Sequence, residues 1–416
     1  MAELDITDPE LDGFDRGFPA AAAGVRCSEV GAQEWDLHAH MSTPIAVIAE
    51  DRLRHNAEVM QAWCRSHGAE LWPHAKTTMS AQLIDRQRRT GASGVTAASA
   101  AQARLLVAWG APAVLVANQL VEPRALADVL AAVVEAESEL TCFVDSIAGV
   151  EILERQAAAV GVHMPVLLEV GAPGARTGVR TASDRDGVLA ALARSAHVRL
   201  IGVAGYEGAF AADRSTESLA RVDSYLSGIV EVLEELVRRG VVESDRPVLS
   251  AGGSMYFDRV VTASQSMRGG HRLVLRSGCY LLHDAGLFQH ATPLPDEPSR
   301  PGLRAALTVW GTVHSRPEAG RAYLDVGRRD VGEDQGLPLV QRRLAAGAAE
   351  PAPLEGVRVI ALNDQHCHLE VDPGALLEVG DRIELGVSHP CTTMDKWRTV
   401  PLVSGRTLVG AITTRF

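Results

Sequence analysis

Residues 113–144, AVLVANQLVEPRALADVLAAVVEAESELTCFV, contain one complete strand–helix–strand unit. A β-type apolar run at 113–117 is followed by an Ala- and Val-rich stretch, Leu126 to Val134, that predicts a buried helix. A second apolar run follows at 140–144. Strands that alternate with helical patterns of about 10–15 residues are typical of βαβ units and a parallel sheet. This stretch therefore predicts an α/β fold for the chain around it.

The same alternation extends in both directions along the chain. Eight apolar runs separated by helical patterns predict a (β/α)8 TIM-type barrel, which typically takes about 250 residues. The runs are 70–73, 94–97, 113–117, 140–144, 165–170, 199–204, 247–250 and 273–276. We assign the barrel to residues 70–295. An earlier run, Ile45–Ala49, is left over and is expected to pair elsewhere.

The alternation stops after about residue 290. Residues 291–302, ATPLPDEPSRPG, are rich in proline and indicate a linker. Apolar runs without helices follow, at 305–313, 321–326, 357–362, 366–371, 382–387 and 407–413. They predict a C-terminal β-domain over 296–416. Residues 44–69 form a strand and a helix before the barrel, and 1–43 form an N-terminal extension that covers the body or an oligomer partner.

Composition narrows the class of protein. A chain of 416 residues with a net charge of −12 offers nothing to attract a nucleic-acid backbone. No run approaches 18 consecutive apolar residues, and the acidic N-terminus does not resemble a signal peptide. Six scattered cysteines without a C-x-x-C motif do not suggest a disulfide framework. We therefore expect a reduced, cytoplasmic protein that binds neither nucleic acid nor membrane.

Lysine is almost absent from the chain. Only two of the 40 basic residues are lysines, Lys76 and Lys396. Lys76 follows the first barrel strand in LWPHAKTTM (71–79), and catalytic side chains of barrels project from the carboxyl ends of strands. We expect Lys76 to be a nucleophilic amine whose pKa is lowered by desolvation. Lys396 lies beside Asp395 and is expected to be a structural, ion-paired residue.

Two turns of small residues follow the last two barrel strands. Such turns often bind phosphate through their backbone N–H groups. Their residues are Gly252, Gly253 and Ser254 in the first turn, and Gly278, Cys279 and Tyr280 in the second. Arg176 in GAPGARTGV (171–179) and Tyr206 in GVAGYEG (202–208) also follow strands. A lysine, a phosphate-binding turn and an aromatic residue at one barrel end suggest pyridoxal 5′-phosphate.

A second group of residues suggests a metal. His389 and Cys391 in SHPCTTMDKWR (388–398) stand two positions apart, so they share one side of an extended segment. A histidine and a thiolate suit Zn²⁺ or a similar ion, although a loop with a buried cysteine has the same spacing. His366, His368 and Glu370 alternate on one strand face in NDQHCHLEV (363–371), a spacing that suits either a metal cluster or the solvent face of an antiparallel sheet. We interpret the last two as surface residues of a sheet.

Taken together, these motifs resemble a known family. PHAKTT (73–78), the Arg176 loop, GYEG (205–208), AGGS (251–254), RSGCYLLHD (276–284) and HPCTTMDKW (389–397) are similar to the D-threonine aldolase and D-serine dehydratase family. These are pyridoxal-phosphate enzymes of the alanine-racemase-like fold, fold type III. The resemblance implies a barrel with a C-terminal β-domain that Ile45–Ala49 joins. It also implies a homodimer in which the β-domain of one subunit faces the barrel of the other.

The resemblance also implies roles for individual residues. Lys76 resembles the lysine that forms a Schiff base with the cofactor, and Arg176 and Tyr206 resemble cofactor-contacting residues. The six turn residues resemble the phosphate-binding turns. His389 and Cys391 resemble the ligands of a divalent metal, for which we expect zinc, with manganese as the alternative. His366 lies where the family has a residue that faces the substrate.

These roles lead us to expect β-elimination from a small D-3-hydroxy amino acid, such as D-serine, D-threonine or 3-hydroxyaspartate. Lys76 would remove the α-proton, the metal would assist departure of the hydroxyl group, and a 2-oxo acid and ammonia would form. Retro-aldol cleavage to glycine and an aldehyde needs the same residues. A His–Cys pair in place of His and a carboxylate resembles the dehydratases.

The sequence leaves two further functions open. An amino-acid racemase needs a second acid or base on the other face of the cofactor and has no use for a metal. A non-enzymatic pyridoxal-phosphate carrier is a small barrel without a β-domain, so the strand-rich region 300–416 disfavours it.

Overall fold

The computed structural model describes residues 8–416, which divide into two compact units. Unit 1 contains Met60–Lys76 and Ile84–Gly278. Unit 2 contains 8–59, Thr77–Leu83 and Cys279–Phe416. The division therefore falls at Cys279, earlier in the chain than the expected boundary at residue 296.

Unit 1 is the predicted (β/α)8 barrel. Its sheet has the strand order β2-β9-β8-β7-β6-β5-β4-β3, and every pair in it is parallel. A parallel bridge between His74 and Thr96 joins the chain after β2 to β3 and closes the ring. The strands are β2 (Ala69–Leu71), β3 (Val95–Ala97), β4 (Ala113–Gln119), β5 (Glu139–Val144), β6 (Met164–Glu169), β7 (Val198–Ala204), β8 (Val248–Ala251) and β9 (Arg272–Leu275).

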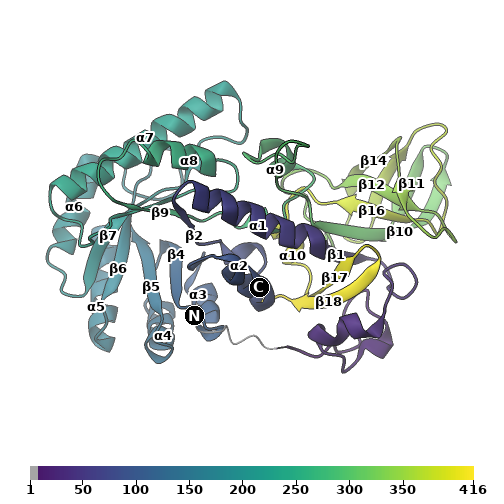
Figure 1. Cartoon of the computed structure of the whole chain (residues 1–416), viewed down its shortest axis with the longest axis horizontal. Helices are drawn as coiled ribbons and strands as arrows, with labels where there is room; N and C mark the ends of the chain where they lie inside the picture. Colours follow the sequence, from purple (N-terminus) through teal and green to yellow (C-terminus); the bar gives the residue numbers. More distant parts are fainter. Residues whose placement is uncertain (1–7) are drawn as a thin grey trace. The chain divides into compact units, whose positions relative to one another are not determined.

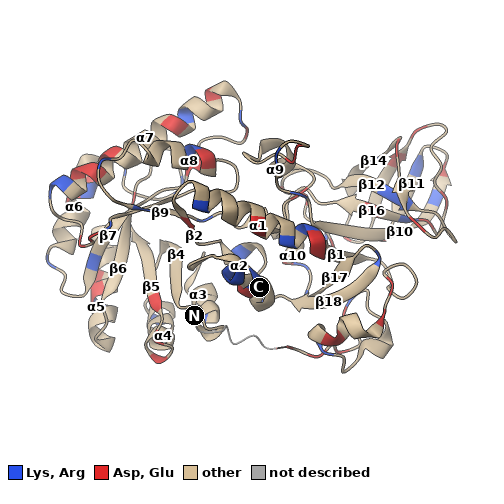
Figure 2. Ribbon diagram, viewed as in Figure 1, with Lys and Arg blue, Asp and Glu red and all other residues tan. Residues whose placement is uncertain are grey.

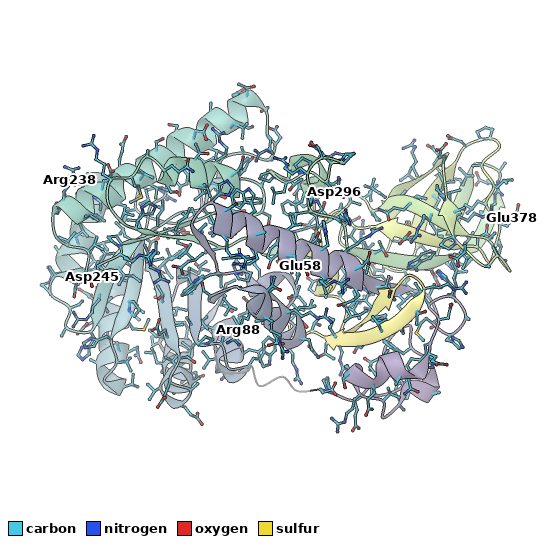
Figure 3. All side chains as sticks on the ribbon, viewed as in Figure 1. Glu58, Arg88, Arg238, Asp245, Asp296 and Glu378 are labelled. Carbon is cyan, nitrogen blue, oxygen red and sulfur yellow. The ribbon has the colours of Figure 1, made fainter. Side chains whose placement is uncertain are left out.

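Helices alternate with these strands and lie outside them (Figure 1). The longest, α7, carries buried apolar residues from Val222 to Leu236 on one face, while Figure 2 shows charged residues along its length. Its exposed end is labelled at Arg238 in Figure 3. The helices are α1 (Glu50–Ser66), α2 (Ala81–Thr90), α3 (Ala100–Ala108), α4 (Pro123–Glu135), α5 (Ile147–Val160), α6 (Ala182–Leu192), α7 (Thr216–Arg238) and α8 (Phe257–Ser264).

Inward-facing side chains fill the barrel. Leu115, Phe143, Leu167 and Val274 come from different strands and form one buried cluster together with Trp72. Burial of each large apolar side chain contributes about 1.5–3 kcal/mol, so this layer is a main source of the barrel's stability. Since the interior is packed, ligands can approach only the strand ends.

The first and last barrel strands are also joined by an ion pair. Arg272 on β9 donates from Nε and Nη2 to the two carboxylate oxygens of Glu70 on β2, at 2.9 and 2.7 Å. These hydrogen bonds hold the pKa of Glu70 below its ordinary value. The paired geometry fixes the register in which β2 meets β9.

Unit 2 contains an antiparallel β-domain that β1 (Ile45–Ala49) joins. β1 pairs antiparallel with β10 and parallel with β17, so the strand left over from the barrel lies inside this sheet. The main path runs β13-β12-β16-β10-β1-β17-β18, and β11, β15 and β14 extend from β10. The strands are β10 (Leu307–Glu318), β11 (Arg321–Leu324), β12 (Leu339–Leu344), β13 (Ala352–Pro353), β14 (Val357–Leu362), β15 (Cys367–Val371), β16 (Arg382–Gly386), β17 (Thr399–Ser404) and β18 (Thr407–Thr413).

Three of these strands, β12, β13 and β17, were not expected. β12 contains Arg342 and Arg343, whose side chains pair with Glu384 and Asp381 on the neighbouring segment. In β12, cross-strand ion pairs therefore take the place of the alternating apolar residues from which a strand is predicted. β17 contains Pro401, a residue that is normally depleted in strands.

The N-terminal extension covers the β-domain of its own chain. Phe18, Val30 and Leu37 pack in one buried cluster with Trp310 and Leu408. The backbone N–H of Leu37 also donates to the carbonyl of Arg406 at 2.8 Å. Residues 8–43 are thus part of unit 2, whereas the start of the extension, 1–7, lies outside the described residues. No helix in the described part of the chain is long and apolar enough to span a membrane.

The close contact between β7 and β8 predicts that a side chain at Gly202 destabilises the protein. A Cβ atom at Gly202 would lie 2.0 Å from the carbonyl oxygen of Val248, so we expect Gly202→Ala to lower the free energy of unfolding by about 1–3 kcal/mol. Gly228, on α7, has open space at the same position, and Gly228→Ala should stabilise the protein by about 0.5–1 kcal/mol. Thermal unfolding of both variants checks this, and equal midpoints would contradict it.

Candidate active site and metal centre

Lys76 lies at the carboxyl end of the first barrel strand, in the short helix η3 (Ala75–Thr77). Its side chain is exposed in the single chain, so the expected desolvation of this amine is not observed. Burial, followed by the positive charges of Lys76, Arg276 and Arg176, holds the pKa of the neighbouring His74 well below its ordinary value. This end of the barrel therefore combines an accessible primary amine with a cationic environment.

The two predicted turns lie side by side. The hydroxyl of Ser277 donates to the carbonyl oxygens of Gly252 and Gly253, at 3.2 and 3.0 Å, and the N–H of Arg276 donates to Gly252 at 3.2 Å. Gly252 has φ +93°, a conformation that favours glycine. The pairing of β8 with β9 thus brings the turns together, as their order in the sequence suggested.

The backbone N–H groups of the first turn already have an acceptor. Gly252 and Gly253 donate to the carboxylate of Glu207, at 3.1 and 2.6 Å, and Glu207 is fully buried. Glu207 lies in the motif GYEG (205–208), but the sequence did not predict a role for it. These two N–H groups stabilise a buried carboxylate, so a phosphate would need other donors from the turns, such as those of Ser254 and Gly278.

Two residues expected to contact the cofactor lie next to the first turn. The guanidinium carbon of Arg176 is 4.7 Å from the centre of the Tyr206 ring. A Cβ atom at Gly253 would be 3.1 Å from that ring, so the missing side chain allows the close approach. The structure therefore gathers Arg176, Tyr206 and the glycine turn at one place in unit 1.

Arg276 was not selected from the sequence as a site residue. Its guanidinium donates to Ser250 Oγ and to the carbonyl of Gly205, both at 2.6 Å, and burial lowers its pKa. The side chain is buried and links the ends of three strands. Its position in the quoted motif RSGCYLLHD was the available signal.

The expected metal ligands lie in unit 2 with a third residue. Single ligand atoms of Cys279, His389 and Cys391 all lie within 4.8 Å of one another, and the two sulfur atoms are 3.3 Å apart. Cys279 was expected only in the second phosphate turn. Two thiols and an imidazole form a donor set that fits Zn²⁺ or another thiophilic ion.

A hydrogen-bonded carboxylate orients His389. Its Nδ1 is 2.7 Å from Asp334 Oδ2, and the hydroxyl of Thr392 donates to the other oxygen of Asp334. Burial lowers the pKa of His389, but hydrogen bonds to Cys279 and Asp334 outweigh this effect and raise it. With Nδ1 engaged, Nε2 is the atom available to a metal, an arrangement typical of metal-binding histidines.

Thr77 contacts both thiols of the cluster. Its Oγ1 is 3.4 Å from Cys391 Sγ and 3.7 Å from Cys279 Sγ, and its side chain is buried. The hydrogen bond with Cys391, followed by burial, raises the pKa of Cys279 well above its ordinary value. The thiol of Cys279 is buried and that of Cys391 half-buried, and the Thr77 hydroxyl is a polar neighbour of both.

The remaining predicted residues differ in their surroundings. His366 is exposed at the start of β15, and its ring centre is 5.0 Å from that of His314. Tyr280 is buried and Ser254 half-buried. Lys396 Nζ lies 3.4 Å from Asp395 Oδ1, which confirms the expected ion pair.

The two residues interpreted as surface residues of a sheet have structural partners. His368 Nε2 is 2.5 Å from Asn363 Oδ1, and Glu370 pairs with Arg321 and Arg358. Neither belongs to the metal cluster found among the described residues.

A lysine at the end of a (β/α)8 barrel, joined in sequence to an antiparallel β-domain, defines the alanine-racemase-like class of pyridoxal-phosphate enzymes. The chain belongs to the family described as "Alanine racemase, N-terminal domain", whose model matches residues 48–274. A second model, "Putative serine dehydratase domain", matches residues 306–403.

Known proteins resemble the chain over most of its length. It is 28% identical to the D-threonine aldolase of an Arthrobacter species, over 86% of this chain and 88% of the relative. It is 26% identical to the D-threo-3-hydroxyaspartate dehydratase of a Delftia species, over 85% of this chain and 92% of the relative. The solved D-threonine aldolase of Filomicrobium marinum superimposes with a TM-score of 0.77 at 24% identity, covering 90% of this chain and 94% of that one.

Two solved structures of D-threo-3-hydroxyaspartate dehydratase are also similar in fold. One carries a histidine-to-alanine substitution and has a TM-score of 0.75 at 23% identity, covering 92% of this chain and 97% of that one. The other carries a cysteine-to-alanine substitution, is described as metal-free, and has a TM-score of 0.73 at 24% identity, covering 90% and 97%. The two substituted positions are two residues apart.

The Asp334–His389 hydrogen bond predicts a contribution to metal binding. We expect Asp334→Asn to weaken zinc binding by about 10–100-fold, because His389 loses the charged acceptor that fixes its ring. Glu333→Gln is the matched control, since Glu333 pairs with Arg328 instead. Competition with a chromophoric chelator measures both affinities, and equal losses in the two variants would contradict the assignment.

Proposed function

We propose that this protein is a pyridoxal-phosphate- and metal-dependent lyase that removes water from a small D-3-hydroxy amino acid and yields a 2-oxo acid and ammonia. The observation that carries this proposal is the His389–Cys391 pair, with its ligand atoms gathered in unit 2. The same His-x-Cys spacing occurs at the substituted positions of two structures of D-threo-3-hydroxyaspartate dehydratase, and the structure of the cysteine variant is described as the metal-free form.

The residues at the barrel end fit pyridoxal phosphate. Lys76 offers an accessible amine, and Arg176 and Tyr206 lie against the turn where Gly253 leaves room. The second turn supplies Gly278, the Cys279 backbone and Tyr280, and Ser254 adds a hydroxyl to the phosphate site. Bound pyridoxal phosphate supplies an electron sink for a carbanion at the substrate α-carbon.

Lys76 is the base in this proposal. Its Nζ accepts the α-proton of the substrate, and the side chain is accessible at the end of the barrel. Arg276 holds a fixed position because Ser250 and Gly205 accept its hydrogen bonds. A primary amine is needed here, which explains why a lysine remains in a chain that otherwise uses arginine.

His389 and Cys391 hold the divalent metal, for which zinc fits the sulfur ligand best and manganese is the alternative. A bound zinc ion supplies Lewis-acid chemistry for departure of the β-hydroxyl group. Asp334 keeps His389 Nε2 available, and Thr77, the residue that follows Lys76 in the chain, lies against the thiols.

Retro-aldol cleavage is the second candidate, favoured by the 28% identity to a D-threonine aldolase. It would use the same lysine and metal and would break the bond between the α- and β-carbons. Amino-acid racemisation is the third candidate, and it would proceed without the metal. The serine dehydratase domain match and the His–Cys pair favour elimination over both.

We further propose that the protein is a cytoplasmic homodimer. His366 and His314 form an exposed pair in unit 2, and a second copy would use His366 to face the substrate of its partner. Scattered cysteines without a disulfide suit a reducing compartment.

Incubation with D-threonine tests the reaction. We expect 2-oxobutyrate and ammonia in equal amounts, with no product from L-threonine and none after treatment with a strong chelator. Glycine and acetaldehyde without 2-oxobutyrate would establish the aldolase reaction instead. Racemised threonine that forms in the presence of the chelator would contradict both lyase reactions.

Substitution of the two lysines tests the base. We expect Lys76→Ala to lower turnover by at least about 10²–10⁴-fold and to remove the visible absorption of the lysine-bound cofactor. Lys396→Ala is the matched control and should keep both, because Lys396 pairs with Asp395. Retained absorption in the Lys76 variant would contradict its assignment.

A further inference from the structure

The metal cluster contains one more candidate ligand than the His389–Cys391 pair. Cys279 Sγ lies 3.3 Å from Cys391 Sγ, and ligand atoms of Cys279, His389 and Cys391 all lie within 4.8 Å of one another. A tetrahedral zinc ion with Zn–S bonds of about 2.3 Å holds two sulfur ligands roughly 3.8 Å apart. The two thiols therefore need to separate by only about half an ångström to share one ion.

The backbone of unit 2 fixes this proximity. Cys279 begins the short helix η5 (Cys279–Leu281), and its carbonyl accepts a 2.7 Å hydrogen bond from His283. The same segment reaches the metal loop at Ala285, whose N–H donates to Val387 at 2.9 Å. A Cβ atom at Gly286 would lie 2.8 Å from Ser388 Cα, so the two segments are closely packed. The course of the chain thus brings the backbone of Cys279 close to the loop that carries His389 and Cys391.

The other cysteines of the chain do not share this arrangement. Cys27, Cys64, Cys142 and Cys367 are buried and belong to no group of potential metal ligands among residues 8–416. Among the described cysteines, Cys279 and Cys391 are the two that stand beside another thiol and an imidazole, and Asp334 holds Nδ1 of that imidazole.

We propose that Cys279 Sγ is a third protein ligand of the metal, so that the ion is held by two thiolates and the His389 imidazole. This inference rests on the metal-dependent function proposed above. Three protein ligands leave a fourth position of a tetrahedral ion open, as catalytic zinc sites require. Two thiolates also favour zinc or cobalt over manganese, because thiolates are soft ligands.

Thr77 suits such a site. Its hydroxyl is 3.4 Å from Cys391 Sγ and 3.7 Å from Cys279 Sγ, close enough to donate to either sulfur once the thiols are ionised. Hydrogen bonds of this kind orient ligands and modulate the charge of the metal centre.

X-ray absorption at the zinc edge tests the proposal directly, because it counts sulfur ligands. The full-length protein, loaded with pyridoxal phosphate and one equivalent of zinc, should show two sulfur ligands at about 2.3 Å. Cys279→Ser should show one and should bind zinc at least tenfold more weakly in chelator competition. Cys142→Ser, which changes a buried thiol on β5 of unit 1, should keep both sulfur ligands and the affinity.

One sulfur ligand in the unsubstituted protein would overturn the proposal, and this result does not depend on whether the variants fold. An unchanged sulfur count and affinity in Cys279→Ser would overturn it as well. In both cases His389 and Cys391 would still hold the metal, and the proposed function would stand. A protein that binds no zinc and keeps its lyase activity in a strong chelator would contradict both proposals.

Discussion

The parallel pairing of β2 with β9 is the constraint on which the barrel site depends. Because all eight strands are parallel and the ring is closed at His74 and Thr96, every strand ends at the same rim. Lys76 follows β2, and Gly278 follows its neighbour β9. Residues that are 202 positions apart in the chain, Glu70 and Arg272, form the ion pair that joins these two strands. The site would not assemble in any other strand order.

Buried charged side chains at this rim are held by hydrogen bonds, so a substitution that removes a partner lowers the stability of the protein. Glu207 accepts two backbone hydrogen bonds, Arg276 donates to Ser250 and Gly205, and Glu169 accepts from Gln119 and Thr177. Removal of one partner from a buried ionic group typically costs about 3–5 kcal/mol, because the remaining charge loses its compensation. These hydrogen bonds hold the side chains of Glu207, Arg276 and Glu169 in fixed positions at the rim.

Sequence patterns predicted the barrel well because its strands are short apolar runs between periodic helices. The expected ends of the barrel strands agree with the structure to within two residues, and β1 lies in the second sheet as the family resemblance implied. The sequence did not predict β12, because ion-paired arginines interrupt its apolar pattern. It did not predict β17, because a proline interrupts that strand. The sequence could place His389 and Cys391 together by spacing, but the thiol of Cys279 joins them only through tertiary folding. The hydrogen bond between the carboxylate of Glu207 and the glycine turn could likewise not be predicted, because no local sequence pattern connects residues 207 and 252.

The scarcity of lysine allows a direct test of the central assignment, that Lys76 binds the cofactor. Reduction of the pyridoxal-phosphate-loaded protein with borohydride makes the covalent link permanent, and peptide mass spectrometry then locates the modified residue. Lys76 and Lys396 are the only lysines in the sequence. We predict that the modification lies on the peptide that contains Lys76 and that the Lys396 peptide is unmodified. A cofactor found on Lys396, or on neither lysine, would contradict this account of the site.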